Sequence, residues 1–276
     1  TAVLREARRR GRPFAMMTAR PELFGGNTDP LRLLPIDDDY VAGIRRLGAR
    51  VVQPYYVTAD PLDVERDRLP SRHIIAEMCA LAGLHGNVAL RPYLNLTASE
   101  LAAGKLFSRQ IALHSSGLAA AIPYHVKEWG SARFVEVARR LAPHAKLVQL
   151  GSVGDPALPV DADLRGQTNL REAGAILAAS DAFVGLEGFL AHLARAVDCP
   201  AVIVMGGRAP SEIFGYTANR NLTAFPDCAP CQRRTGCPYE LQCMAAISPE
   251  EVLRATLDLL SHPPARPLVA SMVPLP

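Results

Sequence analysis

The sequence predicts an α/β protein built from two doubly wound domains, and three observations support this prediction. The chain has 276 residues, 49% of them hydrophobic and 21% charged, which is enough apolar material for a core in each domain. From Gln110 onward, short apolar runs alternate with amphipathic segments, a pattern typical of parallel sheets covered on both faces. The first half alternates in a similar but less regular way. We therefore predict domains at residues 1–104 and 105–276, joined near residues 102–107.

The elements of the first domain follow from periodicity and from capping residues. Apolar residues at helical spacing predict helices, and short apolar runs bounded by turns predict strands. The aspartates at residues 37–39 could bind a metal, but their place before a periodic segment favours a helix cap. Thr97 and Glu100 have the spacing of a capping box. In chain order we expect helix 2–11, strand 13–19, a turn-rich segment 21–35, helix 37–49, strand 50–57 and helix 71–84.

The second domain has the more regular alternation. Its last helix has a serine at the N-cap and a proline directly after it, as helix N-termini favour. In chain order we expect strand 110–117, helix 127–143, strand 146–152, helix 169–180, strand 181–188, helix 189–199, strand 200–207 and helix 248–261.

Charge and hydropathy exclude several classes of partner. A formal net charge of +3 gives no electrostatic argument for a nucleic-acid partner. No apolar run approaches the roughly 18 residues that a transmembrane segment needs, and no secretory signal is visible, so a cytoplasmic location is expected. The chain begins at Thr1, inside a helix-like segment, and we expect further residues to precede it.

Two short segments at predicted strand ends are candidate ligand sites, because open parallel sheets bind ligands there and helix N-termini attract anions. Ser115, Ser116 and Gly117 follow one strand, and Lys127 comes shortly after them. Hydroxyl groups, backbone amides and one lysine suit a diphosphate. These residue types after a strand are also common in α/β proteins that bind nothing there.

The second segment is "GLEGFLAH". Glu187 could accept hydroxyl groups of a ribose or sugar, and Gly188 allows a ligand to approach the backbone. Glu187 could also merely cap its helix, and His192 could be a packing residue. The chain has no GxSxG, GxGxxG or GxxxxGK[ST] motif, which argues against hydrolases, classical dehydrogenases and P-loop NTPases.

Four of the six cysteines lie in the segment 227–243, where a metal site, a disulfide clamp and a cluster of free thiols are all open. A reducing compartment favours metal ligands or free thiols over disulfides. Four thiolates could surround one zinc or iron ion, and in every case we expect a structural loop remote from the chemistry. Cys79 and Cys199 lie in apolar segments and are interpreted as buried hydrophobes. The candidate metal ligands are Cys228, Cys231, Cys237 and Cys243.

The order of several motifs resembles glycosyltransferase family 9, the family of the ADP-heptose:lipopolysaccharide heptosyltransferases. The motifs are "HSSG", "KEW", "LVQLGS", "DLRGQTNLREAGAILAASDAFVG", "EGFLAHLARAV", "PAVIVMGG" and "CMAAISPEEVL", and the resemblance covers about residues 110–260. It implies the GT-B fold of two Rossmann-like domains. It also places the first strand of the family and its Gly-Asp turn before Thr1. The aspartate of that turn is the proposed base of the family, so the catalytic residue of this chain is unassigned.

The resemblance also assigns the candidate site residues. Ser115, Ser116 and Lys127 match the positions that bind the donor diphosphate. Glu187 stands where many heptosyltransferases have aspartate, while His192 keeps the histidine of the motif. The longer carboxyl and the bulky residue after Gly188 suggest a different sugar or nucleotide pose. In autotransporter heptosyltransferase relatives, cysteines at the place of the 227–243 segment bind iron.

The predicted function is transfer of a sugar from a nucleotide-diphosphate donor to an acceptor by inverting displacement, with heptose as one candidate sugar. An ADP-sugar is favoured as the donor, and the acceptor is a glycan, a lipopolysaccharide or a protein. No metal is required for that step, and peripheral association with a membrane stays open. The alternatives are a sugar-nucleotide epimerase of the same architecture and an inactive, metal-clamped binding protein.

Overall fold

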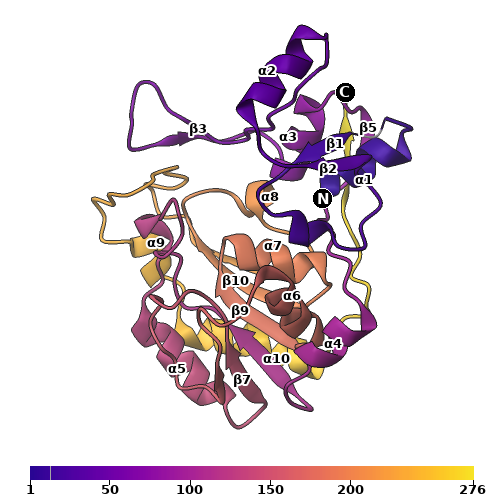
Figure 1. The fold of residues 1–276 in the computed structure, drawn as a ribbon. Helices are drawn as coiled ribbons and strands as arrows, with labels where there is room; N and C mark the ends of the chain where they lie inside the picture. Colours follow the sequence, from indigo (N-terminus) through magenta and orange to yellow (C-terminus); the bar gives the residue numbers. More distant parts are fainter. Residues whose placement is uncertain (13) are drawn as a thin grey trace.

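A six-stranded parallel sheet forms the larger unit of the chain. A computed structural model describes residues 1–12 and 14–276 (Figure 1). The strands lie in the order β11-β10-β9-β6-β7-β8, and every neighbouring pair is parallel. The central strands β6, β9 and β10 are buried along their whole length, which explains their continuous apolar sequences. The strands are β6 Gln110–Leu113, β7 Lys146–Gln149, β8 Ala162–Asp163, β9 Ala182–Leu186, β10 Ala201–Gly206 and β11 Arg220–Thr223.

Helices cover both faces of this sheet. Helices α5 and α10 pack on one face, where Trp129 is fully buried and donates a hydrogen bond to the Ile247 carbonyl at 2.9 Å. Helices α6 and α7 pack on the other face, and Asn169 and Glu172 form a complete capping box at the start of α6. The elements are η2 His125–Lys127, α5 Ser131–Leu141, α6 Leu170–Ala179, α7 Phe189–Ala196, α8 Ser211–Phe214, α9 Gln242–Ala245 and α10 Pro249–Ser261.

The first hundred residues form a smaller unit above the sheet, drawn in indigo and purple in Figure 1. Its strands occur in short pairs: β1 with β2 in parallel, and β3 with β4 and β5 with β12 antiparallel. The elements are α1 Ala2–Arg9, β1 Ala15–Met17, η1 Pro21–Phe24, β2 Arg32–Leu34, α2 Asp38–Arg46, β3 Thr58–Ala59, β4 Asp67–Arg68, α3 Ile74–Leu81, β5 Gly86–Ala89, α4 Ala98–Gly104 and, from the C-terminus, β12 Met272–Leu275.

The structure confirms the predicted α/β class and the elements of the second half, several of which are shorter than predicted. The strand expected at 110–117 ends at Leu113, and the one expected at 146–152 ends at Gln149. The helix expected at 127–143 begins at Ser131, because Gly130 has a left-handed φ of 97° that ends the preceding turn. Lys127 therefore lies in the short helix η2 rather than in α5.

The first half shows the larger differences. The strand expected at 13–19 is present as β1, and Pro13 lies outside the described residues. The strand expected at 50–57 is wrong, since none of these described residues is in a strand. Pro54 cannot donate to a sheet ladder, and Tyr56 and Val57 bury their side chains against the core of the larger unit instead.

The C-terminal strand β12 crosses back to the smaller unit. It pairs with β5 in antiparallel register from Met272 opposite Ala89 to Leu275 opposite Gly86, as the yellow segment in Figure 1 shows. The assignment of all residues from 105 to 276 to the second domain is therefore incomplete. The division near residues 102–107 itself stays a prediction.

The side chain of Gln110 fixes the segment that joins the two units. Its carbonyl oxygen accepts hydrogen bonds from the backbone N–H groups of Leu106 (2.9 Å) and Phe107 (3.1 Å). Its amide donates to the carbonyls of Gly104 (3.0 Å) and Ile176 (3.2 Å). A fully buried amide with both ends bonded holds the start of β6 against α4 and α6.

Two interpretations of polar and thiol groups are confirmed. The Asp37 carboxylate caps α2 by accepting a hydrogen bond from the Tyr40 N–H at 2.8 Å. Cys79 and Cys199 are fully buried, and burial raises the pKa of each thiol to about 12. Within residues 1–12 and 14–276, helices long and apolar enough to span a bilayer are absent.

Candidate functional site

The chain order of the strands reverses between β6 and β9, which are neighbours in the sheet. From β6 the chain continues to β7 and β8 on one side, and from β9 to β10 and β11 on the other. Connections that leave in opposite directions open a crevice at the carboxyl ends of the two strands, where α/β proteins bind ligands. The segment 114–117 follows β6 and Glu187 follows β9, so both predicted segments lie at this crevice.

Lys127 and Glu187 form an ion pair at the crevice. Their side chains are only 17% and 10% exposed. Burial alone would raise the pKa of Glu187, but attraction to Lys127 and Arg208 and the hydrogen bond from Lys127 outweigh it, so the pKa of this carboxyl lies below its ordinary value. The Glu187 carboxylate is therefore ionised at neutral pH. The Lys127 ammonium also lies 4.6 Å from the centroid of the Tyr124 ring.

His192 belongs to a second polar contact on α7. Its Nδ1 lies 2.8 Å from the Tyr216 hydroxyl, and its ring meets the Tyr216 ring edge to face. Burial is the main cause of a lowered pKa for His192, so its imidazole is neutral at neutral pH. The Tyr216 ring also contacts the ring of His73 of the smaller unit, whose Nε2 donates to the Gly215 carbonyl at 3.0 Å. The polar side chains of the two units thus meet at this crevice.

The loop after β6 uses its own polar groups internally. The Ser115 hydroxyl donates to the Pro156 carbonyl at 2.8 Å, and the Ser116 hydroxyl accepts from the Leu118 N–H at 3.2 Å. The Gly117 N–H donates to the Glu128 carboxylate at 2.8 Å. In this conformation these three residues shape the loop, and their role in donor binding stays a prediction.

Gly188 keeps the expected space beside the backbone. It precedes α7, and a Cβ atom added there would meet nothing within 4 Å. The structure therefore brings Lys127, Glu187, Gly188 and His192 to the carboxyl ends of the central strands.

Three polar residues of the crevice were missed in the sequence. Arg208 lies two residues beyond β10, and its side chain forms a buried ion pair with Asp67 of β4. The Tyr124 hydroxyl donates to the same carboxylate at 3.1 Å. The two glycines at the end of β10 were a usable signal for Arg208, because they place the arginine at a strand end. Asp67 and Tyr124 had no such signal, since they meet only through the tertiary fold.

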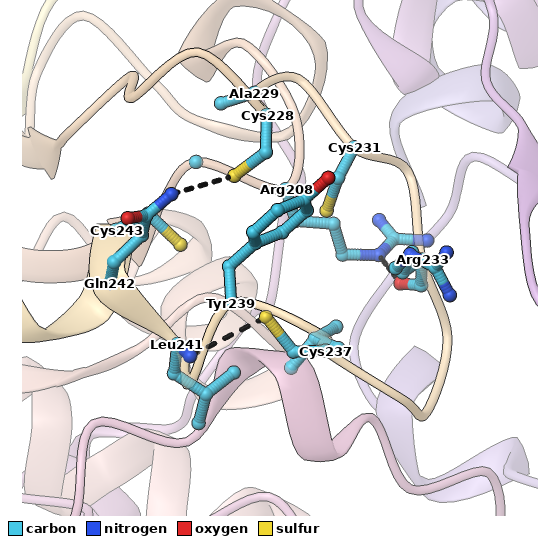
Figure 2. A pocket seen from close by; sticks show the side chains of 12 residues that line it. Arg208, Cys228, Ala229, Cys231, Arg233, Cys237, Tyr239, Leu241, Gln242 and Cys243 are labelled. Carbon is cyan, nitrogen blue, oxygen red and sulfur yellow. Dashed lines mark hydrogen bonds between the residues drawn. The ribbon is translucent and has the colours of Figure 1, made fainter.

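The four clustered cysteines line one small cavity of about 10 Å³ (Figure 2). The Leu241 N–H donates to the Cys237 sulfur at 3.4 Å, and the Gln242 amide donates to the Cys228 sulfur at 3.3 Å. In the described part of the chain, no three His, Cys, Asp or Glu side chains are arranged to hold a metal ion. The loop adjoins the crevice, because Val126, next to Lys127, and Arg208 line the same cavity. Its expected distance from the chemistry stays a prediction.

A larger cleft of about 510 Å³ lies elsewhere, between α4 and the start of α6. An ion pair of Arg171 with Glu100 lies in its wall. It shares none of the site residues described above at the strand ends.

An open parallel sheet with a charged site at its switch point, facing a second α/β unit, is the architecture of glycosyltransferases of the GT-B fold. The family model of glycosyltransferase family 9 (heptosyltransferase) matches residues 70–241, and the chain belongs to this family. It is a glycosyltransferase. No curated protein matches the chain in sequence.

Solved structures of this class resemble the chain over nearly its whole length. The ADP-heptose lipopolysaccharide heptosyltransferase II of E. coli has a TM-score of 0.67 and 18% identity, with 94% of this chain and 93% of that chain covered. The iron-containing dodecameric glycosyltransferase TibC of enterotoxigenic E. coli also has a TM-score of 0.67, with 13% identity, covering 94% and 71%. TibC in complex with ADP-D-β-D-heptose has a TM-score of 0.63 and 14% identity, covering 93% and 70%. At these identities the likeness concerns the fold.

Proposed function

We propose that the protein transfers a sugar from an ADP-sugar to a hydroxyl group of a glycan, lipopolysaccharide or protein acceptor. The mostly buried Lys127–Glu187 pair at the switch point carries this proposal. An ammonium group suits the diphosphate of the donor, and an ionised carboxylate beside it suits sugar or ribose hydroxyls. The complex of TibC with ADP-D-β-D-heptose supports an ADP-sugar as the donor class.

The proposed step is an inverting displacement. The acceptor oxygen forms a bond to the anomeric carbon while the bond from that carbon to the diphosphate oxygen breaks. The nucleoside diphosphate leaves with the electron pair, and a base takes the proton of the acceptor hydroxyl. Lys127 stabilises the negative charge that develops on the leaving oxygen. We assign the base to none of the residues of the crevice.

A panel of ADP-, UDP-, GDP- and CMP-sugars tests the donor and the reaction. We expect the ADP-sugar alone to raise the melting temperature by roughly 5–10 °C at about 100 times Kd, since binding there stabilises the fold by about 2.7 kcal/mol. A new glycoside should form only when an acceptor is added, with inverted anomeric configuration by NMR.

The same panel separates the other functions. Conversion of the sugar nucleotide without an acceptor would identify a sugar-nucleotide epimerase. A donor that binds and is never consumed would identify an inactive binding protein. No shift with any of the four nucleotides would contradict the proposed donor site.

We also propose that Cys228, Cys231, Cys237 and Cys243 bind one zinc or iron ion. The four thiols line one cavity without forming a ligand set in this conformation, so their side chains would have to converge on the ion. Two of them accept N–H···S hydrogen bonds of the kind that stabilise metal-bound thiolates. Burial and the nearby Cys231 and Cys237 raise the pKa of the Cys243 thiol. A divalent cation would reverse this effect by favouring the thiolates. The ion would hold the loop together and takes no part in the displacement.

Metal analysis of the purified chain tests this site. We expect about one equivalent of metal per chain, lost in Cys228→Ser and retained in Cys79→Ser, because Cys79 is buried far from the loop in sequence and outside its cavity. Removal of the ion by a chelator should lower the melting temperature of the wild type, and not that of Cys228→Ser. Four reactive thiols and no bound metal in freshly purified protein would contradict the proposal.

A further inference from the structure

We propose that Arg208 and Arg234 form a second cation site for the diphosphate of the donor, and that Asp67 fills this site in the present conformation. This inference rests on the proposed function, and it adds the hairpin β3–β4 of the smaller unit to the control of donor binding.

The surroundings of Asp67 have the chemistry of an anion site. The carboxylate is fully buried, pairs with the Arg208 guanidinium, and lies 3.0 Å from Nε of Arg234. The Tyr124 hydroxyl donates to it as well. Two guanidinium groups and one hydroxyl around a single anion are the donor set typical of phosphate recognition.

The Asp67 carboxylate does not satisfy all the hydrogen-bond donors around it. Oδ1 of Asp67 accepts no hydrogen bond from the described residues, although Arg234 lies beside it. A diphosphate brings more oxygens and more negative charge than one carboxylate. It would therefore fill the same donors more completely and compete with Asp67 for them.

The second cation site adjoins the one at Lys127. The Arg208 guanidinium carbon lies 4.6 Å from the centroid of the Tyr124 ring and 5.8 Å from that of Phe214. The Lys127 ammonium lies at the same two distances from the same two rings. Arg208 follows β10 and Glu187 follows β9, and these strands are neighbours. A diphosphate held by Lys127 is therefore within reach of Arg208 as well.

In this proposal Asp67 leaves the site when the hairpin β3–β4 moves. It belongs to a hairpin that projects from the smaller unit over the loop of the cysteines (Figure 1), and Leu62 and Val64 at its tip are 91% and 75% exposed. Two backbone hydrogen bonds attach it to that loop: Asp67 N–H to Gln232 at 2.9 Å and Arg234 N–H to Glu65 at 2.8 Å. When the hairpin moves away, both guanidinium groups become free for the donor.

Calorimetric titration with ADP and with inorganic pyrophosphate tests this competition. We expect Asp67→Asn to bind both ligands about 10-fold more tightly than the wild type, because the competing charge is gone. We expect Arg208→Gln to bind both about 10-fold more weakly. The matched control is Asp63→Asn in the same hairpin, whose carboxylate pairs with the half-exposed Arg66 and should leave both affinities unchanged.

The double variant Asp67→Asn/Arg208→Gln controls for loss of folding in the single variants. It removes both charges of the pair, so no buried charge is left without a partner. It should lose the tighter binding of Asp67→Asn and keep a melting temperature closer to that of the wild type. Affinities of folded Asp67→Asn and Arg208→Gln equal to the wild-type values, with Lys127→Ala still weakened, would overturn this inference alone. If neither the wild type nor Asp67→Asn binds ADP or pyrophosphate, the proposed donor site is overturned as well.

Discussion

Replacing Lys127 with alanine is expected to lower kcat/KM for sugar transfer by about 100-fold or more, equivalent to about 2.7 kcal/mol of transition-state stabilisation. The ammonium group is mostly buried and faces Glu187, in a place where a neighbouring charge is weakly screened by water. The negative charge on the leaving diphosphate grows during the displacement, so the loss should fall mainly on kcat. Steady-state kinetics with a radiolabelled donor measures both constants.

Two further variants separate charge from structure. Lys127→Arg keeps a cation and should recover at least part of the lost rate, whereas Lys105→Ala removes an exposed lysine after α4 and should keep the wild-type rate. Equal rates for Lys127→Ala and the wild type would contradict the assignment of the donor site.

The same substitution changes how stability depends on pH. In the wild type the pKa of Glu187 is lowered in the folded state, so the ion pair stabilises the fold above the unfolded pKa and is lost as pH falls through the folded pKa. Without Lys127, burial of Glu187 acts with less opposition and moves its folded pKa upward. The contribution of Glu187 to stability should then decrease as pH rises. Denaturant unfolding of both proteins between pH 4 and pH 8 measures the two trends.

The candidate segments at the strand ends could be predicted from the sequence, because hydrophobic periodicity locates the strands and parallel topology brings their carboxyl ends to one edge of the sheet. Lys127, Glu187 and His192 were candidates because their segments follow predicted strands, and the structure brings these two segments together. The strand expected at 50–57 shows where this reasoning stops. Its tyrosine and valine have strand-like character, yet Pro54 interrupts the ladder and tertiary packing takes their side chains.

Contacts across long sequence distances were not predictable from local pattern. Arg208 and Asp67 are 141 residues apart and meet only because the hairpin of the smaller unit lies against the larger one. Likewise, β12 pairs with β5 because the chain returns from the last helix to the first unit. The inward hydrogen bonds of Ser115 have the same origin, since its acceptor Pro156 lies on another loop.

Replacing Gly104 with alanine is expected to destabilise the protein by about 3 kcal/mol or more. Gly104 ends α4, where the helix crosses α6 so closely that a Cβ atom would lie 2.2 Å from the carbonyl carbon and oxygen of Ala175. The obstructing atoms are backbone, so no rotamer change relieves the clash, and one helix must move. The melting temperature should fall by roughly 6–12 °C in calorimetry.

Gly43 provides the matched comparison, because it lies within α2 and a Cβ atom there would meet nothing within 4 Å. Alanine at this position should stabilise the protein by about 0.5–1 kcal/mol through helix propensity alone. Changes in stability of opposite sign for Gly104→Ala and Gly43→Ala would show that residue 104 must be glycine because α4 and α6 approach closely there. A Gly104→Ala protein as stable as the wild type would mean that these helices can separate freely. The junction of the two units, which Gln110 fastens to the Gly104 carbonyl, would then be far less rigid than its hydrogen bonds imply.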